Sequence, residues 1–310
     1  MQVQIKLYVL LLLRVGRRDF VSEYVLALLK CKGIGNVKVL NFILKYQKDI
    51  NKIKNNLSEL ISFDDLENFE YYLDASKSEI ESNKNNGINI ISILDEGFPD
   101  KLIDIKDPIL YLYYKGDINL INNTSIAVIG SRNVNEMEEK LSQYISSEIS
   151  KKGVTVVSGL AVGIDTSAHL GSYKNVGKTI AVLPSGLNVI TPSSNNVLAN
   201  SILENGGLLV SEYSFNTKAT QYTFVKRDRI QAALSDVVLV IKADENSGTM
   251  HAVKVAQNSN RFVAQYKSNV NKYIYNSFDE SDECIMNLIK KAKDKSLLVE
   301  SNNYTQESLF

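Results

Sequence analysis

Glycine, hydroxyl and charged side chains gather in five segments of the chain, a combination that suits contact with phosphate groups. In Gly130-Ser131-Arg132-Asn133, the glycine lets the backbone approach an anion and Arg132 offers a forked contact to phosphate oxygens. The other segments are Ser158 to Asp165 (with Ser158, Gly159 and Gly163), Leu183 to Leu187, Ser211 to Tyr213, and Asp244 to Thr249 (with Ser247, Gly248 and Thr249). Together they indicate a site for an anion or a nucleotide-like ligand. The alternative is five ordinary strand-to-helix turns with good N-terminal caps.

A further segment, Tyr222 to Arg229, places cations beside aromatic side chains. It reads Tyr222-Thr223-Phe224-Val225-Lys226-Arg227-Asp228-Arg229 and has no hydrophobic period of its own. Cations interleaved with aromatic rings suit a groove that follows a phosphate backbone and stacks bases. The alternative is the solvated start of a helix in which Arg227 pairs with Asp228.

Side chains suited to catalysis or metal binding are few. The chain has two histidines, His169 and His251, and two cysteines, Cys31 and Cys284. Neither a Ser-His-Asp set nor a metal-ligand spacing can be read from them. We expect both histidines to be structural, although the position of His251 just after Gly248-Thr249 leaves a ligand contact open. The sequence thus predicts no catalytic residue, no metal and no cofactor, and the sparse cysteines favour a reducing cytoplasm.

The elements that must position these segments alternate along the chain. Apolar β-type runs are expected at 125–129, 154–157, 179–183, 207–210, 237–241 and 261–264. The helices between them are predicted over 135–151, 163–175, 194–204, 228–234 and 248–258, with Asp165 and Thr166 capping the second. Strands with little polar alternation, each followed by a helix, predict an α/β fold with a doubly wound, mostly parallel Rossmann-like sheet. Ligands of such sheets bind outside the carboxyl ends of the strands, where the phosphate-type segments lie.

The chain as a whole divides into four predicted parts. They are a small helical domain (1–82, with a helix over 62–82), a linker with extended lead-in strands (83–124), the Rossmann-like domain (125–266), and a C-terminal helix near 280–294 with a polar tail (267–310). The polar stretch 82–87 is the predicted linker between the first two parts, and runs 88–94 and 109–114 are the predicted lead-in strands.

Charge and hydropathy exclude several classes of protein. The 310 residues carry 35 basic and 35 acidic side chains, so a general attraction to nucleic acid is not expected and any polyanion site must be local. The apolar run 7–13 is far shorter than the roughly 20 residues of a membrane-spanning helix and lacks a following cleavage site, so we predict a buried helix there.

These motifs together resemble the DNA-processing protein A family, also called Smf. The resemblance covers about residues 88 to 265, and the motifs occur in the family's order. They are Gly97-Phe98-Pro99, Pro108 with Tyr114 to Asp117, Ile126 to Arg132, Val156 to Ala161, Gly163-Ile164-Asp165, Ala168-His169, Thr179 to Leu183, Ser211-Glu212 and Ser247-Gly248-Thr249.

The resemblance implies a non-enzymatic protein that binds and protects incoming single-stranded DNA and helps load a bacterial recombinase onto it, in natural transformation and homologous recombination. It implies a DNA path along Arg132, Lys226, Arg227 and Arg229, with an anion pocket beneath it formed by 158–165 and 247–249. It also implies a cytoplasmic homodimer joined through the Rossmann-like domain, with no membrane contact. The turn Lys32-Gly33-Ile34-Gly35 resembles that of a helix-hairpin-helix, so Gly33 and Gly35 are a possible second DNA contact.

Several positions depart from the family's pattern. Asp228 replaces a usual asparagine and should weaken phosphate attraction, while Val225 replaces a usual proline and Leu170 an arginine. For residues 267–310 we expect only one helix and a polar tail, not the winged helix of many members. Three alternatives remain. The first is a nucleotide sensor or phosphoribohydrolase-like protein of the same superfamily. The second is an interaction module that has lost both activities, which Asp228 would favour, and the third is a specialised copy in a mobile element or defence system. Ala252 stands where the hydrolases have a glutamate.

Overall fold

The computed structural model describes residues 21–243, 247–267, 274 and 276–294. The predicted helix at 7–13 and the polar tail beyond 294 lie outside the described residues. The chain forms two compact units, Met1–Phe98 with Asp107–Leu112 and Pro99–Lys106 with Tyr113–Phe310. The division into four parts stays a prediction, and the two units are described separately below.

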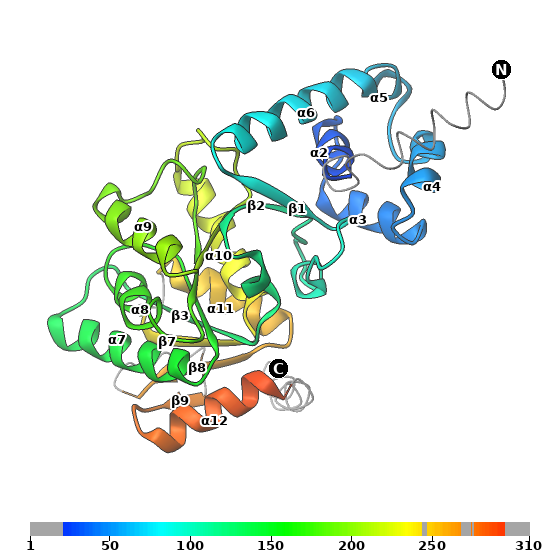
Figure 1. Cartoon of the computed structure of the whole chain (residues 1–310). Coiled ribbons are helices and arrows are strands. Elements are labelled where there is room, and N and C mark those ends of the chain that lie inside the picture. Colours follow the sequence, from blue (N-terminus) through cyan, green and yellow to red (C-terminus); the bar gives the residue numbers. More distant parts are fainter. Residues whose placement is uncertain (1–20, 244–246, 268–273, 275, 295–310) are drawn as a thin grey trace. The chain divides into compact units, whose positions relative to one another are not determined.

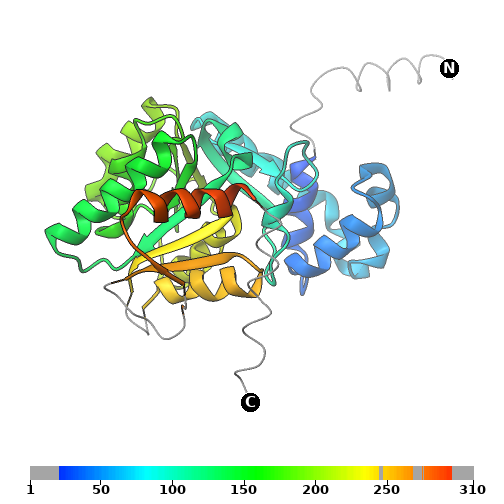
Figure 2. The same cartoon turned by 90° about the horizontal axis from the view of Figure 1, so that it is seen from below.

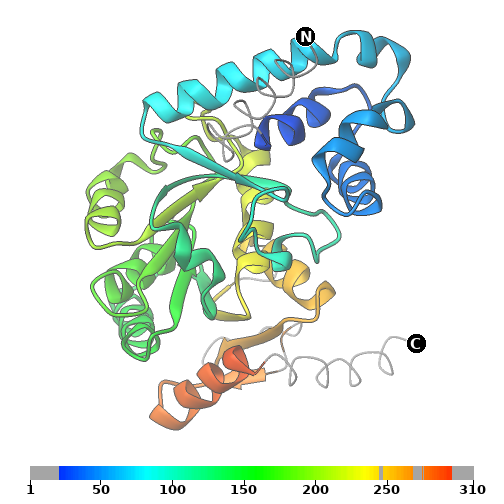
Figure 3. The ribbon, with the colours of Figure 1, turned by 45° about the vertical axis from the view of Figure 1, so that its right-hand side comes forward.

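The first unit is mainly helical. Its elements are α2 (Ser22–Lys30), α3 (Asn36–Lys45), α4 (Ile50–Asn55), α5 (Phe63–Glu67), α6 (Phe69–Asn85), β1 (Asn89–Ser92) and the first residues of β2 (Tyr111–Gly116). Helix α6 packs alongside α2 (Figure 3), and the apolar face of α2, including Val25 and Leu28, is buried. The single helix predicted over 62–82 is two helices divided at Asn68, and α6 continues to Asn85. Most of the predicted linker 82–87 is therefore the last turn of α6.

The second unit contains the predicted sheet. Its strands are the remainder of β2, β3 (Ser125–Gly130), β4 (Thr155–Ser158), β5 (Thr179–Val182), β6 (Leu208–Ser211), β7 (Val237–Lys242), β8 (Phe262–Tyr266) and β9 (Asn276–Phe278). They lie in the order β2-β6-β5-β4-β3-β7-β8-β9, and every neighbouring pair is parallel except β2 with β6. The predicted doubly wound Rossmann-like fold is confirmed. The strand order reverses between β3 and β7, which is where such folds place their ligand.

Helices cover both faces of this sheet. They are α7 (Glu136–Lys151), α8 (Ile164–Ser172), α9 (Asn196–Glu204), α10 (Gln221–Leu234), α11 (Thr249–Asn258) and α12 (Asp282–Lys293). Figure 1 shows α7 and α8 on one side of the strands and α10 and α11 on the other. In Figure 2, α12 lies across the α7 side, where it contacts α7, β3 and β7. Ile126 and Val128 of β3 join the core beneath these helices because alternate residues of a strand face one side.

Three details differ from the sequence prediction. Helix α10 begins at Gln221 rather than near 228, so the whole segment Tyr222 to Arg229 is helical. Gly163 is the N-cap of α8, and Asp165 and Thr166 bond instead to Gly159 N and the Ala161 carbonyl. Strand β9 was not predicted. No helix within the described ranges is long and apolar enough to cross a membrane.

Candidate nucleic-acid interface

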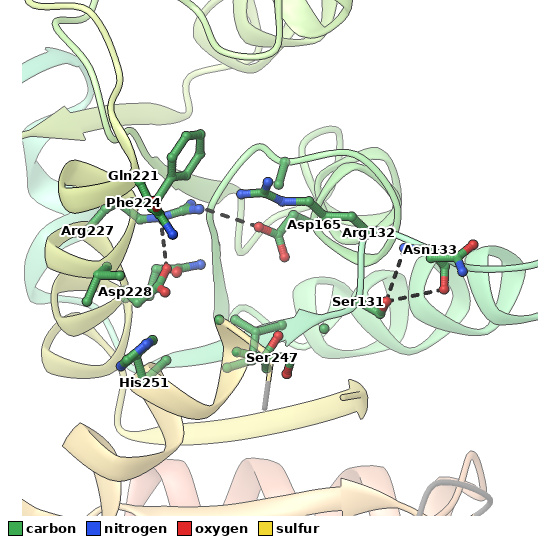
Figure 4. Close-up of a pocket in the computed structure, with 18 residues that line it drawn as sticks. Ser131, Arg132, Asn133, Asp165, Gln221, Phe224, Arg227, Asp228, Ser247 and His251 are labelled. Carbon is green, nitrogen blue, oxygen red and sulfur yellow. Dashed lines mark hydrogen bonds and ion pairs between the residues drawn. The ribbon is translucent and has the colours of Figure 1, made fainter. Parts of the chain in front are cut away.

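A cavity of about 530 Å³ opens at the carboxyl ends of β3 and β7, where the strand order reverses. Its described lining comes from the loop after β3, from the start of α8, from α10 and from the start of α11 (Figure 4). The lining residues are Ile129 to Asn133, Ala161, Asp165, Gln221, Phe224, Val225, Arg227, Asp228, Gln231, Ser247 to Thr249, His251 and Ala252. We call this the switch-point cavity. Its size lies in the range of pockets that hold small molecules.

The loop after β3 brings Arg132 to the cavity. Ser131 N donates to the Lys242 carbonyl at 2.7 Å, which extends the β3–β7 pairing by one residue. Gly163 has φ +81°, and a Cβ there would lie 2.6 Å from the Ser131 carbonyl oxygen. Only glycine fits this conformation and this close approach without strain, so Gly163 lets the start of α8 pack against the loop.

A buried ion triad forms one wall of the cavity. Arg227 is 3% exposed, and its Nη1 donates to the Val182 carbonyl oxygen at 3.0 Å. Its guanidinium also lies 3.2 Å from Asp228 Oδ1 and 3.9 Å from Asp165 Oδ2, and Figure 4 shows the three side chains pointing toward one another. The charge of Arg227 is therefore largely committed within the protein. The pairing of Arg227 with Asp228 matches one reading of the sequence, but the pair is buried rather than solvated.

Gly159 and Gln231 pack against this triad. A Cβ on Gly159 would overlap the Arg227 guanidinium, so the absence of a side chain there makes room for the triad. In the amide orientation that satisfies both of its polar atoms, Gln231 donates to Asp228 Oδ1 at 3.2 Å and accepts from Gly159 N at 2.9 Å. Arg227 and Gln231, both on the same helix as Asp228, thus hold the Asp228 carboxylate in position.

Burial shifts the protonation of both carboxyl groups. Burial raises the pKa of Asp228 to about 6; Arg227 and Arg132 act to lower that pKa, whereas Asp165 acts to raise it. Burial likewise raises the pKa of Asp165, against the lowering effect of Arg227 and of three hydrogen bonds. The cavity therefore holds two cations and two carboxyl groups, and the desolvated carboxylates are the less stable charges in it.

The mouth of the cavity, defined by Arg132 and Phe224, is different in character. Arg132 is exposed, and its guanidinium carbon lies 4.7 Å from the centroid of the Phe224 ring. On the exposed side of α10, Lys226 Nζ lies 5.8 Å from the ring centroid of Tyr222, which is 66% exposed. Two cation–π pairs thus present positive charge and aromatic surface to solvent within a few residues of each other.

The predicted phosphate-binding residues divide into two groups. Gly130, Ser131, Arg132, Arg227, Ser247, Gly248 and Thr249 line the switch-point cavity, whereas Ser158, Gly159, Gly163, Lys226 and Arg229 are not part of its lining. Ser158 is buried and its hydroxyl donates to the Val128 carbonyl at 2.7 Å, within the sheet. Arg229 is also buried, and its Nη2 donates to both carboxylate oxygens of Glu212 at 2.8 Å. Contact with DNA stays a prediction for every one of these residues.

The second predicted contact lies in the first unit. Gly33 and Gly35 are exposed in the turn between α2 and α3, and Gly33 has φ +70°. One amide of this turn, Lys32 N, already donates to Asp65 Oδ1 at 3.4 Å. A phosphate at this turn would meet a carboxylate among its neighbours.

The histidines have different surroundings. His169 is fully buried, its Nδ1 lies 2.8 Å from Thr179 Oγ1, and burial lowers its pKa to about 3. This agrees with the structural role expected for it. His251 is exposed and lines the cavity, which leaves a ligand contact open. Among the described residues, no three His, Cys, Asp or Glu side chains cluster so as to hold a metal ion.

Sequence reasoning missed several cavity residues, chiefly Gln221, Phe224 as a partner of Arg132, and Gln231. A signal for Gln221, Phe224 and Gln231 was available, since they share with Asp228 the three- and four-residue spacing of one helix face. That spacing becomes visible only if the polar segment is recognised as helical.

Comparison with known proteins agrees with this architecture. The model of the DNA recombination-mediator protein A family matches residues 89–295. The chain belongs to this family. The DNA processing protein DprA of Streptococcus pneumoniae is 32% identical over 251 residues, which cover 78% of this chain and 86% of that protein. Protein Smf of Borreliella burgdorferi is 30% identical over 222 residues, which cover 71% and 68%.

Solved structures of the family have the same fold. The X-ray structure of the S. pneumoniae protein aligns with a TM-score of 0.63 at 28% identity and covers 87% of this chain and 92% of its own. A structure of DNA processing protein A from Helicobacter pylori, described for its single-stranded DNA binding mode, aligns with a TM-score of 0.55 at 27% identity and covers 68% and 96%. The resemblance read from the sequence is confirmed, and the chain is a DNA-processing protein of this family.

Proposed function

We propose that the chain binds single-stranded DNA across the mouth of the switch-point cavity. The observation that carries the proposal is the pairing of Arg132 with Phe224 at the mouth, next to Lys226 with Tyr222 on the outer side of α10. Cations that neutralise phosphates and rings that stack bases are what sequence-tolerant binding of a single strand requires. The similar H. pylori protein, which is described as binding single-stranded DNA, supports the same reading.

The cellular role follows from the family. The chain protects incoming DNA and helps load a bacterial recombinase onto it, during natural transformation and homologous recombination, in the cytoplasm. Free Cys31 and Cys284 fit a reducing compartment. Coprecipitation of the recombinase on DNA coated with this chain tests the partnership.

The protein acts without catalysing a reaction. At the position where related hydrolases carry a glutamate, the cavity wall is the buried Ala252. A methyl group can neither activate water nor stabilise a developing positive charge. Release of free base from nucleoside monophosphates would contradict this and favour the phosphoribohydrolase alternative.

The second unit also forms a homodimer. Met137 and Tyr144 of α7 are exposed and lie two helical turns apart on one face, and Leu170 of the neighbouring α8 is exposed as well. Light scattering coupled to gel filtration measures the molar mass, and a single mass near 34.6 kDa at micromolar concentration would contradict the dimer.

Fluorescence polarisation with labelled oligo-dT tests DNA binding. The affinity is expected to fall with salt by about 0.7 log unit per phosphate contact for each log unit of salt. Lys226→Ala should lower both affinity and salt slope. Lys174→Ala is the matched control, because Lys174 also lies over a tyrosine ring, 5.3 Å from the centroid of Tyr173, but in the turn after α8 rather than at the cavity.

Two results would overturn the proposal. The first is an absence of binding to oligo-dT at low salt. The second is equal loss of affinity in Lys226→Ala and Lys174→Ala, which would place the DNA elsewhere on the protein.

A further inference from the structure

The first unit separates positive from negative charge along its sequence. Residues 24–56, which include α3, carry seven lysines and one acidic residue. Residues 57–81, which include α5 and most of α6, carry eight acidic residues and one lysine. Helices α3 and α6 each pack against α2 (Figure 1). The unit therefore presents a basic surface and an acidic surface on different helices.

The acidic surface is a row of exposed side chains along α5 and α6. Phe63 is 71% exposed and Tyr71 is 72% exposed. Asp74 pairs with Lys77 at 3.1 Å, but neither Glu67 nor Glu70 has an ion-pair partner among the described residues. We call the following side chains, which succeed one another at three- and four-residue intervals, the acidic row: Phe63, Glu67, Glu70, Tyr71 and Asp74.

The basic surface is a corresponding row on α3. Lys45 is paired with Glu59, whereas Lys38 Nζ donates to the Gly33 carbonyl oxygen at 2.9 Å, an uncharged partner that leaves its charge unneutralised. Apolar side chains lie between these cations, with Val37 49% exposed and Leu44 45% exposed. We call the following exposed side chains the basic row: Val37, Lys38, Asn41, Leu44 and Lys45.

The two rows are complementary in chemistry. The acidic row sets aromatic rings among carboxylates, and the basic row sets aliphatic side chains among ammonium groups. Covering the exposed apolar side chains is favourable, and the opposite charges select which surface docks on which. One copy of the chain cannot join its own rows, because each row lies on the side of its helix opposite to the buried residues that hold the helix in the unit.

We propose that the acidic row of one copy of this chain docks on the basic row of another copy. The contact is heterologous, since it joins two different surfaces, and each added copy brings a further row for the next one. It is separate from the homodimer through the second unit and does not rest on the proposed DNA binding. Together with that homodimer it links copies into larger assemblies.

Nucleic acid is the other candidate for the basic row. Val37 and Leu44 offer a strand neither a hydrogen bond nor a ring on which a base can stack. At the turn before α3, the Asp65 carboxylate lies 3.4 Å from the Lys32 amide nitrogen, where it would oppose a phosphate. The row is therefore better suited to an acidic protein surface, and the acidic row of a second copy is such a surface.

Sedimentation velocity measures the association of the unaltered full chain. At low salt we expect species heavier than two chains, and their share should grow as the protein concentration is raised through the micromolar range. Raising the salt from 0.1 M to 1 M shortens the Debye length from about 10 Å to about 3 Å and should weaken the contact by about tenfold.

Charge reversal in either row should weaken the association in the same way. Glu67→Lys places a cation at the end of α5 and Lys38→Glu places an anion in the first turn of α3, and both charges suit the helix dipole there, so the melting temperature should be kept. Glu204→Lys is the matched control, because it makes the same exposed reversal at the end of α9 in the second unit and should leave sedimentation unchanged.

The decisive measurement mixes Glu67→Lys with Lys38→Glu. Each variant keeps the row that the other has lost, so the heavier species should return in the mixture although neither variant forms them alone. A mixture that associates no better than its components overturns the proposal, because the two rows then do not meet.

Two further results would also overturn it. One is an unaltered chain with no species heavier than two chains at the lower salt. The other is Lys38→Glu that loses affinity for oligo-dT while its sedimentation is unchanged, which assigns the basic row to DNA. An unaltered chain that associates but does not bind oligo-dT refutes the proposed function and supports this inference.

Discussion

Replacing Arg227 by methionine separates a structural role of this residue from a role in DNA contact. Methionine retains much of the side-chain volume but leaves Asp165 and Asp228 without the cation that faces both, at 3.9 and 3.2 Å. Breaking a buried ion pair by removing one partner typically costs about 3–5 kcal/mol, because a buried charge is left uncompensated. The Val182 carbonyl oxygen would also lose its donor.

This cost translates into a measurable fall in melting temperature. For a domain of this size, a loss of about 3–5 kcal/mol corresponds to a fall of roughly 6–20 °C. Differential scanning fluorimetry at pH 8 measures the shift. The fall should be smaller at pH 5, because loss of Arg227 raises the pKa of Asp165 and Asp228 further, and protonation then removes the uncompensated charges.

Arg132→Met is the comparison variant. Its side chain is exposed at the mouth, so the melting temperature should stay within about 2 °C while oligo-dT affinity and salt slope fall. An unchanged melting temperature for Arg227→Met, together with a loss of DNA affinity like that of Arg132→Met, would refute the structural reasoning. That result would indicate that Arg227 contacts the DNA directly.

Three further predictions concern the second unit. His169 has a pKa lowered to about 3 from an ordinary 6.5, so near pH 5 it takes up a proton only in the unfolded chain. The free energy of unfolding should therefore fall as the pH drops below 6.5, by about 1.4 kcal/mol per pH unit until the folded pKa is reached. Urea denaturation from pH 7 to pH 5 measures this fall, and His169→Gln should make it smaller. Gly159→Ala should destabilise the fold by about 1–3 kcal/mol in the same assay because its methyl group would displace Arg227; an unchanged stability would contradict this. Arg261→Met should lower the melting temperature by several degrees, since Arg261 donates to the carbonyls of Lys101, Ala233 and Ser235; a shift below 1 °C would contradict that role.

The fold could be predicted because its strands are buried on both faces. Runs such as 125–129 and 237–241 consist almost entirely of apolar residues, and each matches an observed strand within about a residue. Strand β9 escaped prediction because it has three residues, of which Asn276 and Ser277 are polar and exposed. The start of α10 escaped because its inner face is built from Arg227, Asp228 and Gln231 rather than from apolar residues, so no hydrophobic period marks it.

The site could be predicted only in outline. The rule that ligands bind at the carboxyl ends of parallel strands correctly directs attention to the loops after β3 and β7. Which cations are free to meet a ligand depends on tertiary pairing. Arg227 and Arg229 look equivalent to Arg132 in the sequence, but Asp165 and Glu212, brought close by the fold, pair with them.

The division of α10 into an outer and an inner side has a consequence for how this protein can change. Exposed Tyr222 and half-buried Lys226 form the outer side, whereas Arg227, Asp228 and Gln231 form the cavity wall, although all five lie within ten residues. Substitutions on the outer side can alter how strongly any polyanion is held, without rearranging the wall. Substitutions on the inner side can alter which chemical group is accepted, at nearly constant surface charge. Strength and selectivity are therefore separable traits, open to independent variation among descendants of this chain or to deliberate redesign.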